Sequence, residues 1–172
     1  AVRKVDANMV VKKKGGKDVE VPDGWAGHIL PFDLVQEKLL SADLAEIGTY
    51  ESRLTEISSE IADILENLDE DDKNSTDAVS EDGDSFVATE LKKAVKSIGK
   101  DPETDFDRAL VNAQRLFDEE REVKKNVKNL RSALDEKTRT VIEGLSGEQA
   151  ADLLAAKWVE PLQRKLEELP QT

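Results

Sequence analysis

The sequence predicts a mainly α-helical fold: a long antiparallel helical hairpin, coiled-coil-like, with extra short helices and a small N-terminal β-hairpin. Two stretches carry apolar residues at alternating spacings of three and four, which keeps one narrow stripe facing a partner helix. Charged residues make up 37% of the 172 residues and aromatic residues 4%, a composition typical of long exposed helices. Since neither stripe is stable in water, we expect the two helices to bury them against each other. The predicted seam comprises Ile47, Leu54, Ile57, Ile61, Ile64 and Leu68 on the first helix and Leu116, Val123, Val127, Leu130 and Leu134 on the second.

The bulk composition argues against several classes of function. The formal net charge is −13, so we expect the surface to repel nucleic acid phosphate and no strong nucleic-acid binding by this chain. Cysteine is absent and His28 is the single histidine, which argues against a thiolate or histidine-rich metal site. No apolar run approaches the roughly 20 residues that a membrane span needs, and the N-terminus lacks the apolar core of a signal peptide. We therefore expect a cytoplasmic protein and, because the chain starts without Met, a piece of a longer one.

Along the chain we expect three segments that together form one structural unit. Residues 1–33 comprise a small β-hairpin followed by an apolar loop. Residues 34–141 comprise the helical hairpin, with an inserted tip segment over residues 69–101. Residues 142–172 comprise a C-terminal helical segment.

A β-hairpin is predicted over residues 8–21. Short valine-rich runs flank Gly15-Gly16, and paired glycines supply the positive φ angles of a tight turn. The lysine triplet Lys12-Lys13-Lys14 is placed at the tip. We expect these lysines to keep the edge of the hairpin solvated; a phosphate contact is the less favoured alternative, because a lone triplet is a weak signal.

The segment over residues 22–33 is predicted to be a loop, because its two prolines block helix formation and its glycines allow tight bends. It carries much apolar surface for a loop, so we expect it to fold back as a plug against the base of the helical hairpin. His28 is expected to be packed or solvated, since no second acid–base or metal-ligating group lies nearby in the sequence. The apolar side chains are those of Trp25, Ile29, Leu30 and Phe32.

Capping signals set the expected helix boundaries. The first helix is predicted to begin at Asp33, with Gln36 completing a capping box and a second cap at Ser41. Over residues 69–84 we expect an acidic solvated loop, because the ligand spacing of a calcium loop is missing. The remaining start signals are Ser85 before a helix over residues 86–98, Asp101-Pro102-Glu103 before the second long helix, and Ser146 with Gln149 before the terminal segment, which Pro161 should kink or restart.

The two long helices carry opposite charges, and we expect ion pairs across the hairpin. Such exposed pairs stabilise little, but they help to set register and orientation. The acidic residues are Glu51, Glu56, Glu60, Asp63 and Glu66, and the basic ones are Arg121, Lys124, Lys125, Lys128 and Arg131.

No motif in the sequence indicates chemistry. It lacks a phosphate-cradling glycine-rich loop, a nucleophile elbow, a histidine-based metal motif and an Asn-Pro-Pro-aromatic motif. We therefore expect protein–protein contact, made by apolar residues in excess of what a thin hairpin buries. The alternative is that the two tryptophans pack on each other as a small core. The candidate interface residues are Trp25, Phe32, Trp158 and Leu162.

One stretch is GWAGHILPFDLVQ over residues 24–36, followed by Ala42-Asp43-Leu44 and the heptad helix. This stretch and several others resemble the C-terminal region of the modification (DNA methyltransferase) subunit of type I restriction–modification systems. The others lie towards the C-terminus, and the similarity spans most of the chain. They are Leu134-Asp135-Glu136-Lys137, Leu145-Ser146-Gly147-Glu148-Gln149 and Lys157-Trp158.

This resemblance implies a parent enzyme that uses S-adenosylmethionine to methylate adenine N6. The family works as two modification subunits with one specificity subunit, and its C-terminal helices pack onto helices of the specificity subunit. The family's cofactor motif and catalytic motif belong to a central catalytic domain and have no counterpart in this sequence. The resemblance therefore implies subunit assembly for this chain, with the specificity subunit and the catalytic domain of the parent as partners, and no catalytic, cofactor or metal residue.

Two other functions compete with assembly in a methyltransferase. One is a generic coiled-coil interaction or scaffold hairpin, which would have no need for the loop at residues 22–36 or for Lys157-Trp158. The other is a nucleic-acid-gripping arm, which the net charge disfavours because such an arm should show a dominant basic face.

Overall fold

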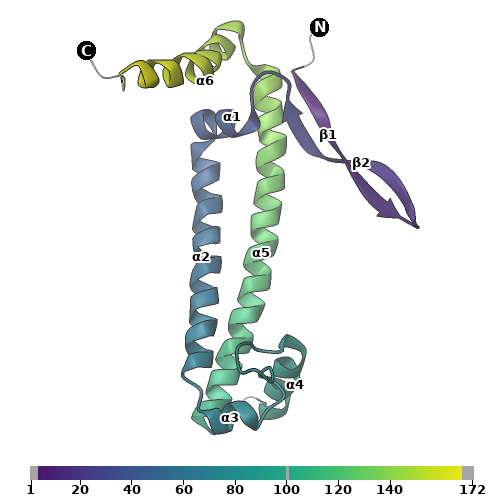
Figure 1. Cartoon of the computed structure of the whole chain (residues 1–172), viewed down its shortest axis with the longest axis vertical. Coiled ribbons are helices and arrows are strands. Elements are labelled where there is room, and N and C mark those ends of the chain that lie inside the picture. Colours follow the sequence, from purple (N-terminus) through teal and green to yellow (C-terminus); the bar gives the residue numbers. More distant parts are fainter. Residues whose placement is uncertain (1–3, 100, 168–172) are drawn as a thin grey trace. The chain divides into compact units, whose positions relative to one another are not determined.

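The computed structural model describes residues 4–99 and 101–167, with side chains described for residues 4–99 and 101–159. The predicted mainly helical fold with a small N-terminal β-hairpin is confirmed (Figure 1). The elements are β1 (Val5–Lys14), β2 (Lys17–Gly27), α1 (Phe32–Leu39), α2 (Ser41–Glu66), α3 (Glu70–Asn74), α4 (Ala88–Ile98), α5 (Asp105–Gly144) and α6 (Gly147–Glu167).

The chain divides into two compact units, each of which we describe by itself. The terminal unit combines Ala1–Ile47 with Lys128–Thr172, and the middle unit is Gly48–Val127. The long helices α2 and α5 contribute residues to both units.

The two strands form an antiparallel ribbon that is longer than the predicted hairpin. Gly15 (φ 60°) and Gly16 (φ 79°) make the expected tight turn. The loop prediction for residues 22–27 was wrong, because β2 continues to Gly27. Pro22 lies at an irregularity in the strand register. Ala7 pairs with Trp25 and Met9 pairs with Pro22, so two residues of β1 correspond to three of β2. A bulge of this kind tolerates a residue that has no amide hydrogen to donate.

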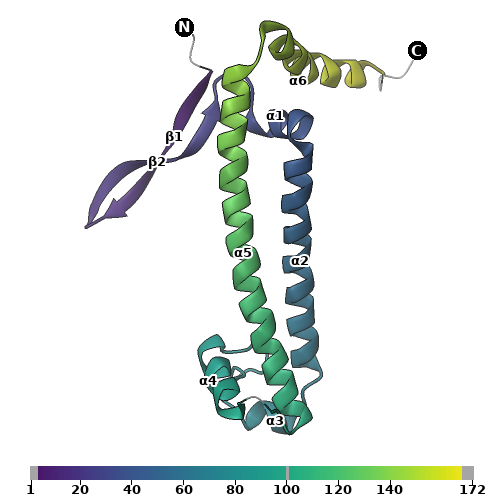
Figure 2. The ribbon, with the colours of Figure 1, turned by 180° about the vertical axis from the view of Figure 1, so that it is seen from behind.

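In the middle unit, the α2 residues after Ile47 and the α5 residues up to Val127 lie side by side in both views (Figures 1 and 2). Their contact is a cluster of Ile57, Leu116 and Val123, all buried. Tyr50 and four partly buried side chains of the predicted seam pack around it: Leu54, Ile61, Ile64 and Val127. Three of the remaining seam positions lie in the terminal unit: Ile47 and Leu134 are buried, and Leu130 is half-buried. The fourth, Leu68, belongs to a second cluster in the middle unit.

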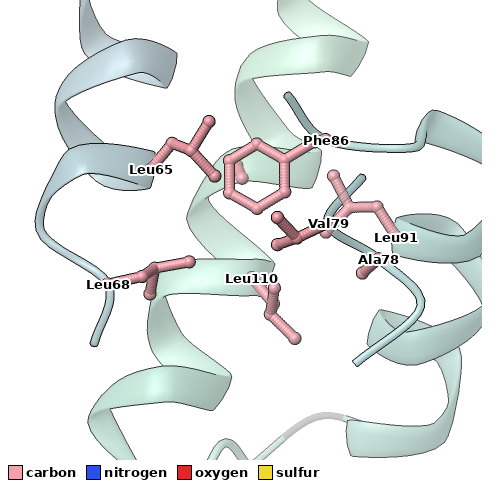
Figure 3. Close-up of a cluster of buried hydrophobic side chains, with 8 residues drawn as sticks. Leu65, Leu68, Ala78, Val79, Phe86, Leu91 and Leu110 are labelled. Carbon is pink, nitrogen blue, oxygen red and sulfur yellow. The ribbon is translucent and has the colours of Figure 1, made fainter. Parts of the chain in front are cut away.

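That second cluster shows how the tip segment is held. Side chains from α2, α4 and α5 and from the segment before α4 gather around Phe86 (Figure 3). The Phe86 ring meets Phe117 edge to face at 6.4 Å between centroids, a favourable aromatic geometry. The buried members are Leu65, Leu68, Ala78, Val79, Phe86, Leu91, Leu110 and Ala113.

Helix starts in the middle unit differ from the predicted ones. Phe86 was predicted to open the helix, but it forms a β-bridge with Val79. Helix α4 therefore begins at Ala88, after Val87, and Ser85 is no cap. Helix α5 begins at Asp105, after the Asp101-Pro102-Glu103 sequence that was predicted to open it. The cap is Thr104, whose Oγ1 accepts from the Asp107 amide at 3.0 Å while Asp107 Oδ2 accepts from the Thr104 amide at 3.1 Å. In addition, α3 forms within the segment predicted to be a solvated loop.

The terminal unit has its own core, to which α1, the end of α5 and α6 contribute. Helix α1 begins at Phe32 after Pro31, and the predicted Asp33–Gln36 capping box does not form. Ser41 is the first residue of α2 and therefore no cap. The predicted start of α6 is confirmed: the Ser146 amide donates to Gln149 Oε1 at 3.0 Å, and the Gln149 amide donates to Ser146 Oγ at 3.2 Å. The buried core members are Leu30, Val35, Ile142, Leu145 and Leu153.

Two further findings concern the helices. Helix α6 runs through Pro161 as one element to Glu167, so the chain does not restart there. In the described part of the chain, the helices are too short or too polar to cross a membrane.

Candidate functional site: a protein-interaction surface on helix α6

Hydrogen bonds between residues far apart in the sequence join three parts of the terminal unit. These parts are the ribbon, the segment before α1, and the connection between α5 and α6. Lys4 donates from Nζ to the carbonyl oxygens of Glu143 (3.2 Å) and Leu145 (3.0 Å). The last carbonyls of a helix have no amide partner within it, so a lysine at this end stabilises α5. Lys157 on α6 donates from Nζ to the carbonyl oxygen of Ile29 at 2.9 Å. These bonds fix the start of α6 beside the end of the ribbon.

A polar network joins α1 to α5 within the same unit. Gln36 donates from Nε2 to Asp135 Oδ1 (3.3 Å) and to Thr138 Oγ1 (3.1 Å). Thr138 is fully buried, and its hydroxyl donates to the Leu134 carbonyl oxygen at 2.6 Å. A buried hydroxyl with partners on both sides carries no desolvation penalty, so this network orients α1 on α5. It also explains why Gln36 does not cap its own helix.

Two of the predicted interface residues make contacts inside the terminal unit. The Trp25 ring lies 4.1 Å from the Arg139 guanidinium carbon, a cation–π contact. Arg139 is held in turn by Glu136 (2.9 Å) and Glu143 (3.3 Å) on its own helix. Phe32 packs against the buried core of this unit. The ring contacts of the two tryptophans are with cations: Trp25 meets Arg139, and Trp158, which is 61% exposed, meets the ammonium of Lys157.

Trp158 remains the exposed candidate. It is 61% exposed although α6 has a buried face that includes Leu153. Lys157 Nζ lies 4.9 Å from the Trp158 ring centroid and also bonds the Ile29 backbone, and the Ile29 side chain is 55% exposed. Trp158 and Ile29 therefore flank one lysine, and we call these three residues the Trp158 surface. An exposed indole is typical of an interface anchor, and exposed apolar side chains mark interaction sites.

A shallow groove of about 290 Å³ lies between α1 and α6. Its apolar lining comes from Leu39, Leu153 and Ala156, of which Leu39 is exposed. Leu162, the last predicted interface residue, belongs to α6 by its backbone, and its side chain lies outside the described residues.

The structure also forms a side-chain hydrogen bond that the sequence did not indicate. His28 Nδ1 lies 2.9 Å from Asp6 Oδ2, and the His28 amide donates to the Lys4 carbonyl oxygen at 3.0 Å. The two residues are brought together by the extension of the ribbon to Val5 and Gly27, which local sequence signals did not show. The described residues contain no group of three or more His, Cys, Asp or Glu side chains that could hold a metal ion. The contact between His28 and Asp6 therefore joins the two strands at the base of the ribbon.

One ion pair across the middle unit has its basic residue on α2 and its acidic residue on α5, the reverse of the prediction. Arg53 on α2 pairs with Glu119 on α5 (Nε to Oε1, 2.7 Å) and with Glu60 on its own helix (2.6 Å). These carboxylates raise the pKa of Arg53, and the Arg53 guanidinium lowers the pKa of Glu119 below its ordinary range. In the predicted basic face, Arg121 and Lys124 pair with carboxylates of α5 itself. The predicted pairing across the hairpin is therefore wrong for these two residues.

The chain matches no protein-family model, no curated protein sequence and no solved structure.

Proposed function

We propose that this chain is the non-catalytic C-terminal helical region of a type I restriction–modification N6-adenine DNA methyltransferase subunit, and that it mediates assembly with the specificity subunit. The main support for the assembly role is the exposure of Trp158 and Ile29 in the Trp158 surface. A partner helix that covered the Trp158 ring and Ile29 would bury apolar surface that the terminal unit leaves in water.

The residues behind the sequence resemblance give this proposal further support. They come from distant parts of the chain, yet they contact one another in the terminal unit. Trp25 of the first stretch meets Arg139, which follows Leu134-Asp135-Glu136-Lys137 on α5. Gln36 bonds Asp135, and Ile29 accepts from Lys157. A generic scaffold hairpin has no need for such a junction.

In this proposal the parent enzyme supplies S-adenosylmethionine chemistry through its separate catalytic domain, and the complex acts in the cytoplasm. The two long helices form a coiled-coil-like hairpin within the assembly. The heptad spacing and the buried cluster of Ile57, Leu116 and Val123 support this part of the proposal. A coiled-coil scaffold unrelated to DNA modification is the alternative function, and the packing in the middle unit would serve it equally well.

The test is co-purification of the chain with the specificity subunit. We expect Trp158→Ala to abolish co-purification and to leave the thermal melt, followed by circular dichroism, nearly unchanged, because the side chain is mostly in water. Val159→Ala is the matched control: Val159 is the next residue of α6 and is 47% exposed, so its truncation should leave binding intact. Retained binding in Trp158→Ala would reject the anchor role, and a sharply lowered melting temperature would show that Trp158 belongs to the core.

A further inference from the structure

The outer half of the ribbon, beyond the register irregularity at Met9 and Pro22, carries apolar residues that remain in water. Met9 is 49% exposed and Val11 is 62% exposed, on the strand that leads to the turn. A two-stranded ribbon without a covering layer is marginally stable in water. This ribbon therefore presents its tip to solvent without a packing partner among the described residues.

The tip concentrates positive charge in a strongly acidic chain. Four lysines fall within six residues, in the sequence KKKGGK from Lys12 to Lys17, against a net charge of −13 for the whole chain. All four are exposed. Lys12 pairs with Asp23 at 3.1 Å, and in the described part of the chain Lys13, Lys14 and Lys17 have no carboxylate within ion-pair distance.

The register sets two of these lysines against each other. Lys14 and Lys17 stand directly opposite on either side of the Gly15-Gly16 turn, and directly opposite residues of an antiparallel pair point to the same face. Like charges in this position destabilise the pair. Scattered lysines on a strand edge are explained by protection against aggregation. Two lysines opposite each other at the turn are not needed for that protection, and their repulsion is unfavourable. An anion placed between the two ammonium groups removes the repulsion.

We propose that the ribbon tip is a contact site for the phosphate backbone of duplex DNA. The evidence is charge complementarity: Lys14 and Lys17 stand opposite each other on one face, and Lys13 stands on the other face opposite Asp18. Residues 12–18 thus carry four positive charges against one negative charge, an arrangement that suits phosphates on two sides of a groove. The major groove of B-form DNA, about 12 Å wide, admits a two-stranded β-ribbon whose strands are about 5 Å apart. The site is independent of the Trp158 surface and of the proposed assembly role.

The acidity of the rest of the chain makes the contact weak at physiological salt. Three phosphate contacts give a slope of log K against log salt concentration of about −2.7, so binding falls roughly 200-fold between about 20 and 150 mM salt. We therefore expect fluorescence anisotropy with a labelled duplex to detect binding of the full chain at about 20 mM salt. At about 150 mM salt the same titration should show little or no binding.

The decisive variant combines Lys13→Gln, Lys14→Gln and Lys17→Gln. Each lost phosphate contact should reduce the salt slope by about 1, so this variant should show almost no salt-dependent binding. The matched control combines Lys92→Gln, Lys96→Gln and Lys125→Gln, which are exposed lysines of the middle unit and change the net charge equally. The control should retain the slope of the unchanged chain. Equal loss in both variants would overturn the proposal, since net charge alone would then explain the binding.

Two further measurements identify the ligand and separate the site from folding. Lys17→Glu places an opposite charge across from Lys14, so it should favour the ribbon and still weaken DNA binding. A polyglutamate peptide of equal charge should compete poorly with the duplex. Equal competition by polyglutamate, or self-association at low salt that the tip variant abolishes, would mean that the lysines bind carboxylates, and the proposal would be wrong. Retained co-purification of the tip variant with the specificity subunit would leave the assembly proposal standing in either case.

Discussion

Gly27 determines how the ribbon turns into α1. A Cβ atom at this position would lie 1.7 Å from the carbonyl oxygen of Leu30, a distance that requires the backbone to move. The same turn carries Ile29 to Lys157 and Leu30 into the core of the terminal unit. The requirement for glycine therefore comes from the close approach of two backbone segments.

We expect Gly27→Ala to lower the free energy of unfolding by more than about 2 kcal/mol, because relieving this clash displaces Leu30 from the core. Gly48→Ala is the control, since no atom lies within 4 Å of a Cβ at that helical position. It should stabilise the protein by about 0.5–1 kcal/mol through helix propensity. Chemical denaturation of both variants measures the difference, and equal midpoints would contradict the close approach.

Glu119 links stability to pH. Its pKa is lowered below the ordinary 4.5 because the Arg53 guanidinium donates to it. A lowered pKa means that the ionised form is favoured in the folded state, so the contribution to stability is present above pH 4.5 and lost as the pH falls through the folded pKa. We expect acid titration of the unfolding free energy to show a decline in this range that is smaller in Glu119→Gln. An identical decline in the variant would show that the Arg53 contact does not contribute.

At the scale of elements, packing across the middle unit is uneven along the predicted seam. Ile57 is fully buried with Leu116 and Val123, whereas Ile61 is only partly buried. The heptad spacing alone gave no reason to distinguish these two positions.

We expect Ile57→Ala to cost about 2–5 kcal/mol, because it leaves a cavity in a site that is closed on all sides. Ile61→Ala removes the same atoms from a partly exposed position and should cost less. The denaturation midpoints of the two variants provide the comparison. A larger loss in Ile61→Ala would mean that the contact between α2 and α5 is centred elsewhere.

Local signals predicted the elements whose stabilising contacts are themselves local. The Gly15-Gly16 turn and the Ser146–Gln149 capping box are set by neighbouring residues, and both formed as expected. The predicted capping box at Asp33 does not form, for two reasons. Helix α1 begins earlier, at Phe32 after Pro31. In addition, the side-chain amide of Gln36 donates to Asp135 and Thr138 on α5. Tertiary partners outweighed a local cap.

At the candidate site, the sequence indicated which residue types matter but not how they are used. Trp25 and Trp158 were equivalent as exposed aromatic candidates. The structure separates them, because Arg139 covers Trp25 while Trp158 remains in water. The contacts that decide this, such as Lys157 to Ile29, join residues more than 100 positions apart, and no local pattern reports them.

At the scale of the whole molecule, the chain combines two kinds of surface. The Trp158 surface exposes two apolar side chains around one lysine and suits a protein partner, whereas the ribbon tip is basic and suits phosphate. Both lie in the terminal unit, at positions fixed by the β-hairpin, the segment before α1 and α6. The sequence offers no catalytic motif beside either surface.

The proposed parent enzyme needs a cofactor site that this chain is not expected to supply. A glycine-rich cofactor loop follows a strand and opens a helix within a βαβ unit, whereas the described strands of this chain form one antiparallel ribbon whose Gly15-Gly16 turn joins strand to strand. We therefore expect the isolated chain to give no saturable heat when it is titrated with S-adenosylmethionine at micromolar concentrations. The whole parent subunit, titrated in the same way, should give saturable heat if the proposed function is right. Saturable micromolar binding by the isolated chain would show that it holds a cofactor site of its own and is more than an assembly region.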